Sequence, residues 1–76
     1  SRDFELEADE YAVERLHKHN MSRKCLSSAF REFAKINKMS FEDSNEFLTT
    51  YFSTHPGLKE RVENIESRYA SDPECN

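Results

Sequence analysis

Apolar residues recur every three to four positions along most of this 76-residue sequence, the spacing that places side chains on one side of an α-helix. One glycine and two prolines leave few positions that favour tight turns. The pattern therefore predicts an all-α fold, a bundle-like arrangement of three to four helices without a sheet. The spacing is clearest in the second helix, at Leu26, Ala29, Phe30, Phe33, Ala34 and Ile36.

Local signals predict where the helices begin and end. The first helix covers residues 2–19, and Asn20 suits the left-handed conformation that ends a helix. Ser22 is a suitable N-cap for the second helix, which ends near residue 37 or 38. Ser40 opens a shorter third helix, and Pro56 suits the first turn of a fourth. Residues 1–70 are thus expected to form the helical domain, and residues 71–76 a disordered tail.

Charge and cysteine content narrow the classes of function. The net charge is -4 and basic residues do not cluster with aromatic ones, so a nucleic-acid partner is disfavoured. The sequence contains neither an apolar run that could span a membrane nor a signal peptide, so these residues by themselves are expected to be soluble. Two cysteines, Cys25 and Cys75, are too few for a disulfide framework, and a bridge to the expected tail is not predicted.

Two acids stand on the apolar side of the first helix. At 100° per residue, Glu5 and Asp9 fall among its apolar residues, one turn apart, whereas Glu7 points to the opposite, solvated side. One interpretation is that they are simply solvated acids near a helix N-terminus, which they stabilise. The other is that they are paired or bind a metal, because a carboxylate pointed at a core is otherwise costly.

His55 and Arg61 are the other candidates, at the start of the fourth helix. His55 precedes Pro56, so it is either a junction or N-cap residue or a proton donor near a metal. Arg61 lies at the edge of the apolar side of its helix. Its side chain either reaches a buried carboxylate with two hydrogen bonds or extends to solvent.

Two segments carry a family resemblance. Residues 4–12, FELEADEYA, resemble the E-x-x-A-D motif of HtpX-like and CAAX prenyl protease-like zinc metallopeptidases, which are membrane-associated gluzincins. Residues 53–62, STHPGLKERV, resemble the S-x-H-P-x-x-x-E-R-[IV] segment of the same proteins, and the two motifs occur in the family order. The resemblance covers about residues 1–66.

The resemblance implies a role for each candidate. Glu5 matches the third zinc ligand, and Asp9 matches the acid that orients a ligand histidine. His55 matches the histidine that faces the active site, and Arg61 matches the arginine of the final motif. The cofactor implied is zinc, held by three protein ligands with one position left for water.

The family's H-E-x-x-H motif, which supplies two histidine ligands and the general base, does not occur in this sequence. The sequence is therefore expected to be the C-terminal part of a zinc metalloendopeptidase, inactive alone, or part of a homologue that lacks the motif. Its expected partners are the N-terminal part of the peptidase domain and a protein or peptide substrate. The parent protein is expected to be associated with a bacterial membrane.

The alternative is a non-catalytic helical module that binds another protein. The aromatic residues of the expected third helix would then form the partner surface, although such a face is also typical of a core. These residues are Phe41, Phe47, Tyr51 and Phe52.

Overall fold

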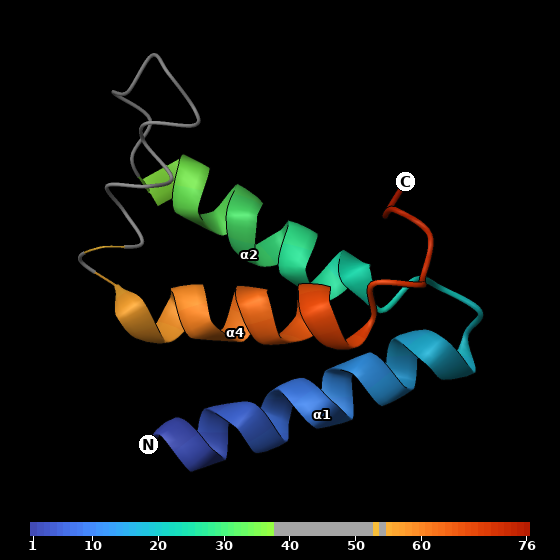
Figure 1. Cartoon of the computed structure of the whole chain (residues 1–76), viewed down its shortest axis with the longest axis horizontal. Helices are drawn as coiled ribbons and strands as arrows, with labels where there is room; N and C mark the ends of the chain where they lie inside the picture. The colour runs from blue at the N-terminus through green and yellow to red at the C-terminus, as the bar shows by residue number, and fades with distance from the viewer. Residues whose placement is uncertain (38–52, 54) are drawn as a thin grey trace.

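Three helices make up the described part of the chain. The computed structural model describes residues 1–37, 53 and 55–76, in which α1 spans Arg2–Lys18, α2 spans Lys24–Asn37 and α4 spans Pro56–Arg68. The prediction of an all-α fold is confirmed over these residues. The helices alternate in direction, so that α1 and α4 run parallel and α2 runs antiparallel to both (Figure 1). The predicted third helix, with its four aromatic residues, lies outside the described residues.

Local hydrogen bonds define both ends of α1. At its start, the Ser1 hydroxyl accepts a hydrogen bond from the amide of Phe4 at 3.3 Å. At its end, Asn20 has a φ of 60°, as the sequence predicts. The amide of Asn20 donates to the carbonyl of His17, and the amide of Met21 donates to that of Leu16. This pair of bonds satisfies carbonyls that the last helical turn would otherwise leave without partners.

The starts of α2 and α4 also follow from local sequence. The Ser22 hydroxyl accepts a hydrogen bond from the amide of Lys24 at 3.1 Å, consistent with its predicted capping role. Pro56 is the first residue of α4, where its missing N–H is not needed, and His55 is the N-cap residue. The two helices begin within two residues of the predicted positions. Helix caps are formed by residues close in sequence, so local sequence is enough to predict them.

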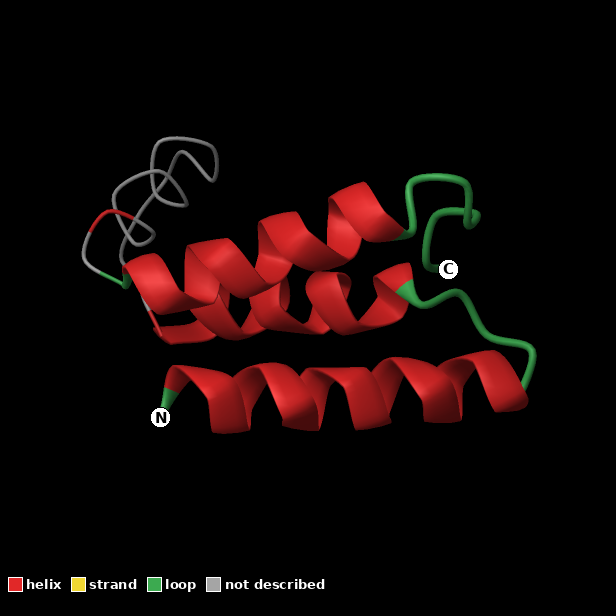
Figure 2. Ribbon diagram, turned by 60° about the horizontal axis from the view of Figure 1, so that its bottom comes forward, coloured by secondary structure: helices red, strands yellow, loops and turns green. Residues whose placement is uncertain are grey.

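The core of the described residues lies mainly between α2 and α4, which make the most extensive helix contact (Figure 2). Its buried apolar residues are Ala34 of α2 and Val62 and Ile65 of α4, and Val13 is the one buried apolar residue of α1. Ser27 is also buried, and its hydroxyl donates to the carbonyl of Lys24 at 2.9 Å. Four small or medium apolar side chains give this part of the chain a modest hydrophobic contribution.

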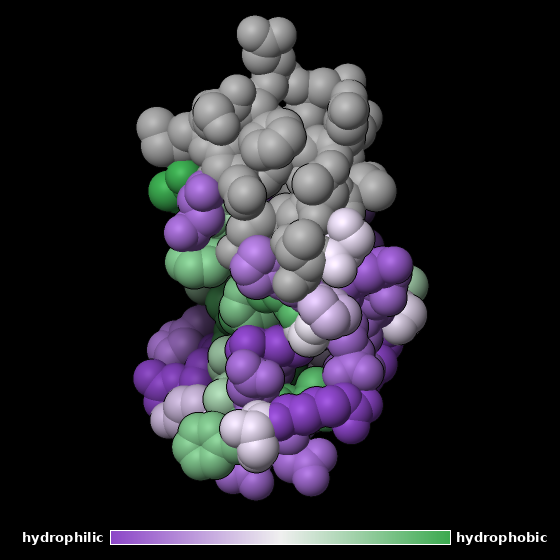
Figure 3. Space-filling view, turned by 90° about the vertical axis from the view of Figure 1, so that its left-hand side faces the viewer, coloured by the Kyte–Doolittle hydropathy of each residue, from purple (hydrophilic) through white to green (hydrophobic). Residues whose placement is uncertain are grey.

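Several apolar residues that the spacing assigns to the inner side are exposed. Phe4 is 72% exposed, Phe33 is 55% exposed and Ile36 is 64% exposed. Each lies on a side of its helix that no other described helix covers. Figure 3 views the end of the molecule where α1 and α4 begin, and it shows hydrophobic side chains in a strip between hydrophilic ones. None of the helices in the described ranges is long and apolar enough to cross a membrane.

The C-terminal residues are tied to the start of α2. Cys75 forms a disulfide with Cys25, so the expectation that these cysteines stay separate is wrong. Asp72 in addition pairs with Arg23 at 2.8 Å. These contacts are unlike the disordered tail that the sequence predicts for residues 71–76. Because α2 and α4 are antiparallel, the end of α4 lies beside the start of α2, and this proximity is not visible from a sequence separation of 50 residues.

Candidate functional site

Three of the four candidate residues meet between α1 and α4. Glu5 and Asp9 project from the same side of α1, one turn apart, and Arg61 projects from the second turn of α4 toward both. Since α1 and α4 are parallel, their N-terminal halves lie side by side and bring these residues together (Figure 1). The prediction that the two acids face inward rather than into solvent is therefore confirmed for Asp9, which is 5% exposed, whereas the side chain of Glu5 is 52% exposed.

Asp9 and Arg61 form a bidentate ion pair. Nε of Arg61 donates to Oδ2 of Asp9 at 2.8 Å, and Nη2 donates to Oδ1 at 2.7 Å. Asp9 is 5% exposed, and the guanidinium of Arg61 also lies over the ring of Phe30 at 4.6 Å. Of the two orientations that the sequence leaves open for Arg61, the structure shows the one that reaches a buried carboxylate. The bonded Asp9 carboxylate, with Glu5 nearby, raises the pKa of Arg61, which stays cationic.

Glu5 occupies a different environment from Asp9. Its Oε2 lies 3.7 Å from Nη1 of Arg61, an ion-pair distance rather than a hydrogen bond, and its side chain is 52% exposed. Both oxygens of Asp9 are engaged by Arg61, whereas Glu5 is attracted by the same cation without being enclosed by it. The structure thus separates a buried, fixed acid from an accessible one, both held by a single arginine.

His55 lies at the N-terminal end of α4, six residues before Arg61, and is exposed. Its φ of -131° and ψ of 67° are outside the helical range, as expected for the residue before a helix. The structure therefore places His55 at the same end of the molecule as the first turns of α1 and α4, where Glu5 lies (Figure 1). Its role as a residue facing an active site stays a prediction.

Glu5, Asp9 and Arg61 form what we call the acid cluster. Two further ion pairs flank it, and the sequence pattern predicted neither. Arg2 binds Glu60 with hydrogen bonds of 2.7 and 2.9 Å, and Arg68 binds Glu10 with bonds of 2.6 and 3.2 Å. Each arginine lowers the pKa of its partner glutamate. Glu10 belongs to the solvated side of α1 in the helical projection, and it does remain half-exposed. The sequence signal for the Glu10 pair is an arginine at the same level along a parallel helix.

The side chains of this site can be compared with the ligands that a catalytic zinc requires. A catalytic zinc needs three protein ligands and an open position, and within residues 1–37, 53 and 55–76 no three His, Cys, Asp or Glu residues are grouped to hold a metal. Glu5 fits as one ligand, because its carboxylate is half-exposed and accepts no hydrogen bond from Arg61. Asp9 does not fit as a direct ligand, since it is buried and both its oxygens already accept hydrogen bonds from Arg61.

An apolar groove lies beside the acid cluster, on the side of α1 that faces α2. It has a volume of about 390 Å³ and is formed by the second half of α1, the connection and the first half of α2. Ala12 and Ala29 are the small residues in its walls, and Leu16 and Leu26 are the larger ones. Small side chains on facing helices permit the close approach of another element.

Comparison with known proteins identifies one family. The family model described as Peptidase family M48 matches residues 1–69, which includes all three helices and every candidate residue. A search of curated proteins finds no match, and a search of solved structures finds none either.

Proposed function

Because this chain belongs to peptidase family M48, a family of metallopeptidases, we propose that it forms the C-terminal part of a zinc metalloendopeptidase and supplies the third zinc ligand, Glu5. The observation that carries this proposal is the contrast between the two acids around Arg61. Glu5 keeps an accessible carboxylate at 3.7 Å from the cation, while Asp9 is enclosed by it. When bound, zinc would polarise the scissile carbonyl of a protein or peptide substrate and activate a water molecule.

Arg61 has a positioning role in this proposal. It holds Asp9 with two short hydrogen bonds and attracts Glu5 with its third nitrogen, so it sets the spacing of the two carboxylates. An ionised carboxylate is the form that binds a metal. The engagement of Arg61 with both acids supports this role over a purely surface role.

Asp9 would act on a neighbouring imidazole rather than on the metal. A carboxylate has about four acceptor positions. The two hydrogen bonds from Arg61 use one position on each oxygen of Asp9, so each oxygen retains another. A ligand histidine from a neighbouring segment could donate its second N–H to one of these positions, which would fix its tautomer and orientation. The burial of Asp9 would favour such a bond, because water competes weakly there.

The two histidine ligands and the general base must come from outside these 76 residues, since the sequence has no H-E-x-x-H motif. The apolar groove between α1 and α2 supports this part of the proposal. Ala12 and Ala29 leave room for an additional helix, which would lie next to the side of α1 that bears Glu5 and Asp9. These residues alone would then lack peptidase activity. Membership in the HtpX-like or CAAX prenyl protease-like subgroup, and the placing of His55 at the active site, belong to the same proposal.

The proposal also includes a location. We infer that the parent protein is membrane-associated and that this domain lies on an oxidising side of the membrane. The support for the second part is the Cys25–Cys75 disulfide, because such bonds persist where thiols are not kept reduced.

Three variants of a chain that carries both this segment and an H-E-x-x-H helix test the proposal. Glu5→Gln removes the charged ligand at constant size, so zinc content and peptide hydrolysis should both be lost. Asp9→Asn should retain part of the zinc and lower activity by roughly 10–100-fold. Glu7→Gln is the matched control, because Glu7 is exposed on the opposite side of α1.

The measurements are metal content by elemental analysis, hydrolysis of a casein substrate, and the thermal midpoint of each variant. The thermal midpoint separates loss of a ligand from loss of the fold. Full zinc content and activity in Glu5→Gln, or equal damage from Glu7→Gln, would contradict the proposal.

A further inference from the structure

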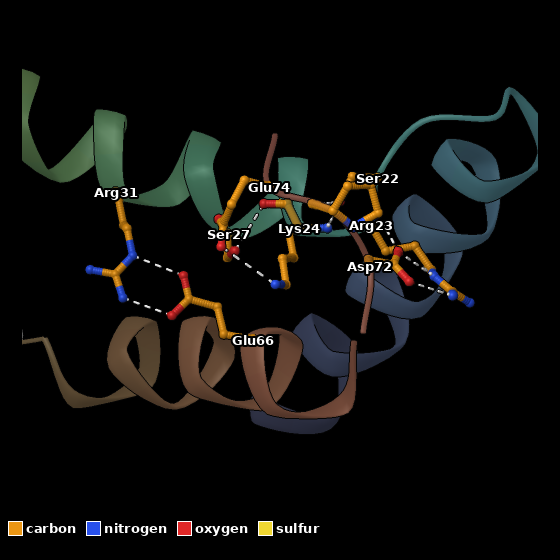
Figure 4. A network of polar contacts seen from close by, with 9 residues as sticks. Ser22, Arg23, Lys24, Ser27, Arg31, Glu66, Asp72 and Glu74 are labelled. Carbon is orange, nitrogen blue, oxygen red and sulfur yellow. Dashed lines mark hydrogen bonds and ion pairs between the residues drawn. The ribbon is translucent and has the colours of Figure 1, made fainter. Parts of the chain in front are cut away.

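The start of α2 and the C-terminal segment are joined residue by residue. Each of the four residues 22–25 contacts one of the four residues 72–75, and we call these two segments the C-terminal clasp. Figure 4 shows its ion pairs, of Arg23 with Asp72 and of Lys24 with Glu74. The contacts comprise a hydrogen bond, a bidentate ion pair, a longer ion pair and a disulfide. The pairs are Ser22 with Pro73, Arg23 with Asp72, Lys24 with Glu74 and Cys25 with Cys75.

Arg23 and Asp72 form the main polar contact of the clasp. Asp72 accepts hydrogen bonds from the backbone amide, Nε and Nη2 of Arg23, at 2.9, 2.9 and 2.8 Å. These bonds hold the pKa of Asp72 well below its ordinary value. The guanidinium also lies over the ring of Tyr69, at 4.4 Å from its centre. This contact brings the two cysteines near each other, and their Cα atoms lie 4.8 Å apart, within the usual range for a disulfide.

The clasp is what holds the C-terminal segment to the helices. The buried apolar residues of the described chain are Val13, Ala34, Val62 and Ile65, and none of them belongs to residues 70–76. The contact between Lys24 and Glu74 is 3.5 Å long and Glu74 is 89% exposed, so it adds little. The segment is therefore held by polar contacts of Asp72 and Pro73 and by one covalent bond, the disulfide.

We propose that the clasp is a redox-dependent latch, which the Cys25–Cys75 disulfide closes and a dithiol reductant opens. A thiolate of the reductant attacks Sγ of Cys75, the S–S bond breaks, and its electron pair leaves on Sγ of Cys25. The second thiol of the reductant then attacks the mixed disulfide, releases Cys75 and closes the oxidised, cyclic reductant. Two electrons and two protons pass from the reductant to the two cysteines.

The position of Cys25 favours this direction of cleavage. Cys25 is the second residue of α2, so the positive end of the helix dipole stabilises its thiolate as the leaving group. Opening the latch releases residues 70–76 and exposes Arg23 and Lys24 at the start of α2. The latch is independent of the proposed metal ligand, since none of its residues belongs to the acid cluster.

Nuclear magnetic resonance relaxation on the 76-residue chain tests the latch. In the oxidised chain we expect backbone order parameters of about 0.85 for residues 70–75, as for the helices. After treatment with dithiothreitol we expect these values to fall below about 0.6, while the resonances of α1 and α4 keep their dispersion. The double variant Cys25→Ser, Cys75→Ser should match the reduced chain with or without dithiothreitol. Oxidised Asp72→Asn should remain ordered, because its bridge is intact.

Four results would overturn the proposal. The first is free alkylation of both cysteines in the untreated chain, and the second is an ordered segment after reduction. The third is loss of dispersion along the whole chain on reduction, which would make the disulfide a general staple of the fold. The fourth is a mobile segment in oxidised Asp72→Asn, which would assign the latch to the ion pair instead.

Discussion

The ion pair between Asp9 and Arg61 should respond unequally to the removal of its two partners. Arg61→Ala leaves Asp9, which is 5% exposed, without its hydrogen-bond donors in the interior. Asp9→Ala leaves Arg61, whose side chain is 20% exposed and still lies 3.7 Å from Glu5. An unpaired acid in the interior costs more than an arginine that retains a second partner and some solvent. We therefore expect Arg61→Ala to be the more damaging change.

The magnitudes follow from this burial. Removing one partner of a fully buried ion pair costs about 3–5 kcal/mol in the free energy of unfolding. Arg61→Ala should lie at the lower end, about 3 kcal/mol, because Arg61 is partly exposed; this includes the lost stacking on Phe30. Asp9→Ala should cost about 2 kcal/mol. A chain of this length is stable by only about 4–11 kcal/mol, so both effects are large.

Urea unfolding of the oxidised chain, followed by circular dichroism, measures these changes. With a slope of about 1 kcal/mol per M, the urea midpoint should fall by about 3 M for Arg61→Ala and by about 2 M for Asp9→Ala. The double variant completes a cycle whose coupling free energy should be about 2 kcal/mol. Arg61→Lys keeps the charge without the two-pronged geometry and should lose less than Arg61→Ala. Arg15→Ala, at an exposed arginine of α1, should change the free energy by less than about 0.5 kcal/mol.

A coupling free energy below about 0.5 kcal/mol would refute the reasoning, since it would mean that the two residues do not stabilise each other. An equal or reversed order of the two single variants would refute the argument from burial, even if the coupling were present.

Three further predictions concern the rest of the described chain. Stability should fall as the pH drops below about 4, because arginines lower the pKa of Glu66 and of Asp72 in the folded chain. The stabilisation is present above the pKa values of the unfolded chain and is lost as the pH falls through those of the folded chain. Urea midpoints measured between pH 6 and pH 2 should therefore depend less on pH in Asp72→Asn than in the wild type. Glu66→Gln should lose about 0.5–1 kcal/mol at neutral pH, the usual value for a half-exposed pair such as Glu66 with Arg31, and a cycle with Arg31→Gln measures it. Asn20 has a φ of 60°, so Asn20→Val should cost about 1–2 kcal/mol by thermal unfolding, whereas Asn20→Gly should be neutral or stabilising.

The features that the sequence could predict depend on neighbouring residues. The helical spacing identified α1, α2 and α4, and Asn20 and Pro56 located two of their ends, because capping uses residues within one turn. The position of Asp9 on the apolar side of α1 likewise followed from helix geometry alone. The sequence also left open the bidentate contact of Arg61, which the structure shows.

The features that the sequence could not predict depend on how the helices are placed. The disulfide joins residues 50 positions apart, and the spacing could not show that the end of α4 returns to the start of α2. Phe33 and Ile36 follow the helical period, but the period does not say whether a neighbouring helix covers that side. The binding of a metal by Glu5 stays a prediction, because the remaining ligands would come from residues beyond these 76.

The exposed ion pairs between α1 and α4 matter more for how the two helices are aligned than for the stability of the chain. The two pairs lie at opposite ends of the interface, and in both the partners are 58 residues apart in sequence. Parallel helices with the same offset in both pairs are in register, and exposed pairs fix that register although they add little to stability. The pairs are Arg2 with Glu60 and Glu10 with Arg68.

Sliding α1 by one helical turn, about 5.4 Å, would destroy this match. In one direction, Arg2 would move opposite Asn64 and Arg68 opposite Leu6, so that neither arginine faces an acid. In the other direction, Arg2 would move opposite Pro56 and Arg68 opposite Glu14, so only one of the two pairs would be replaced. The exposed ion pairs therefore fix the position of α1 along the axis of α4, and with it the level along α4 at which the carboxylate of Glu5 lies.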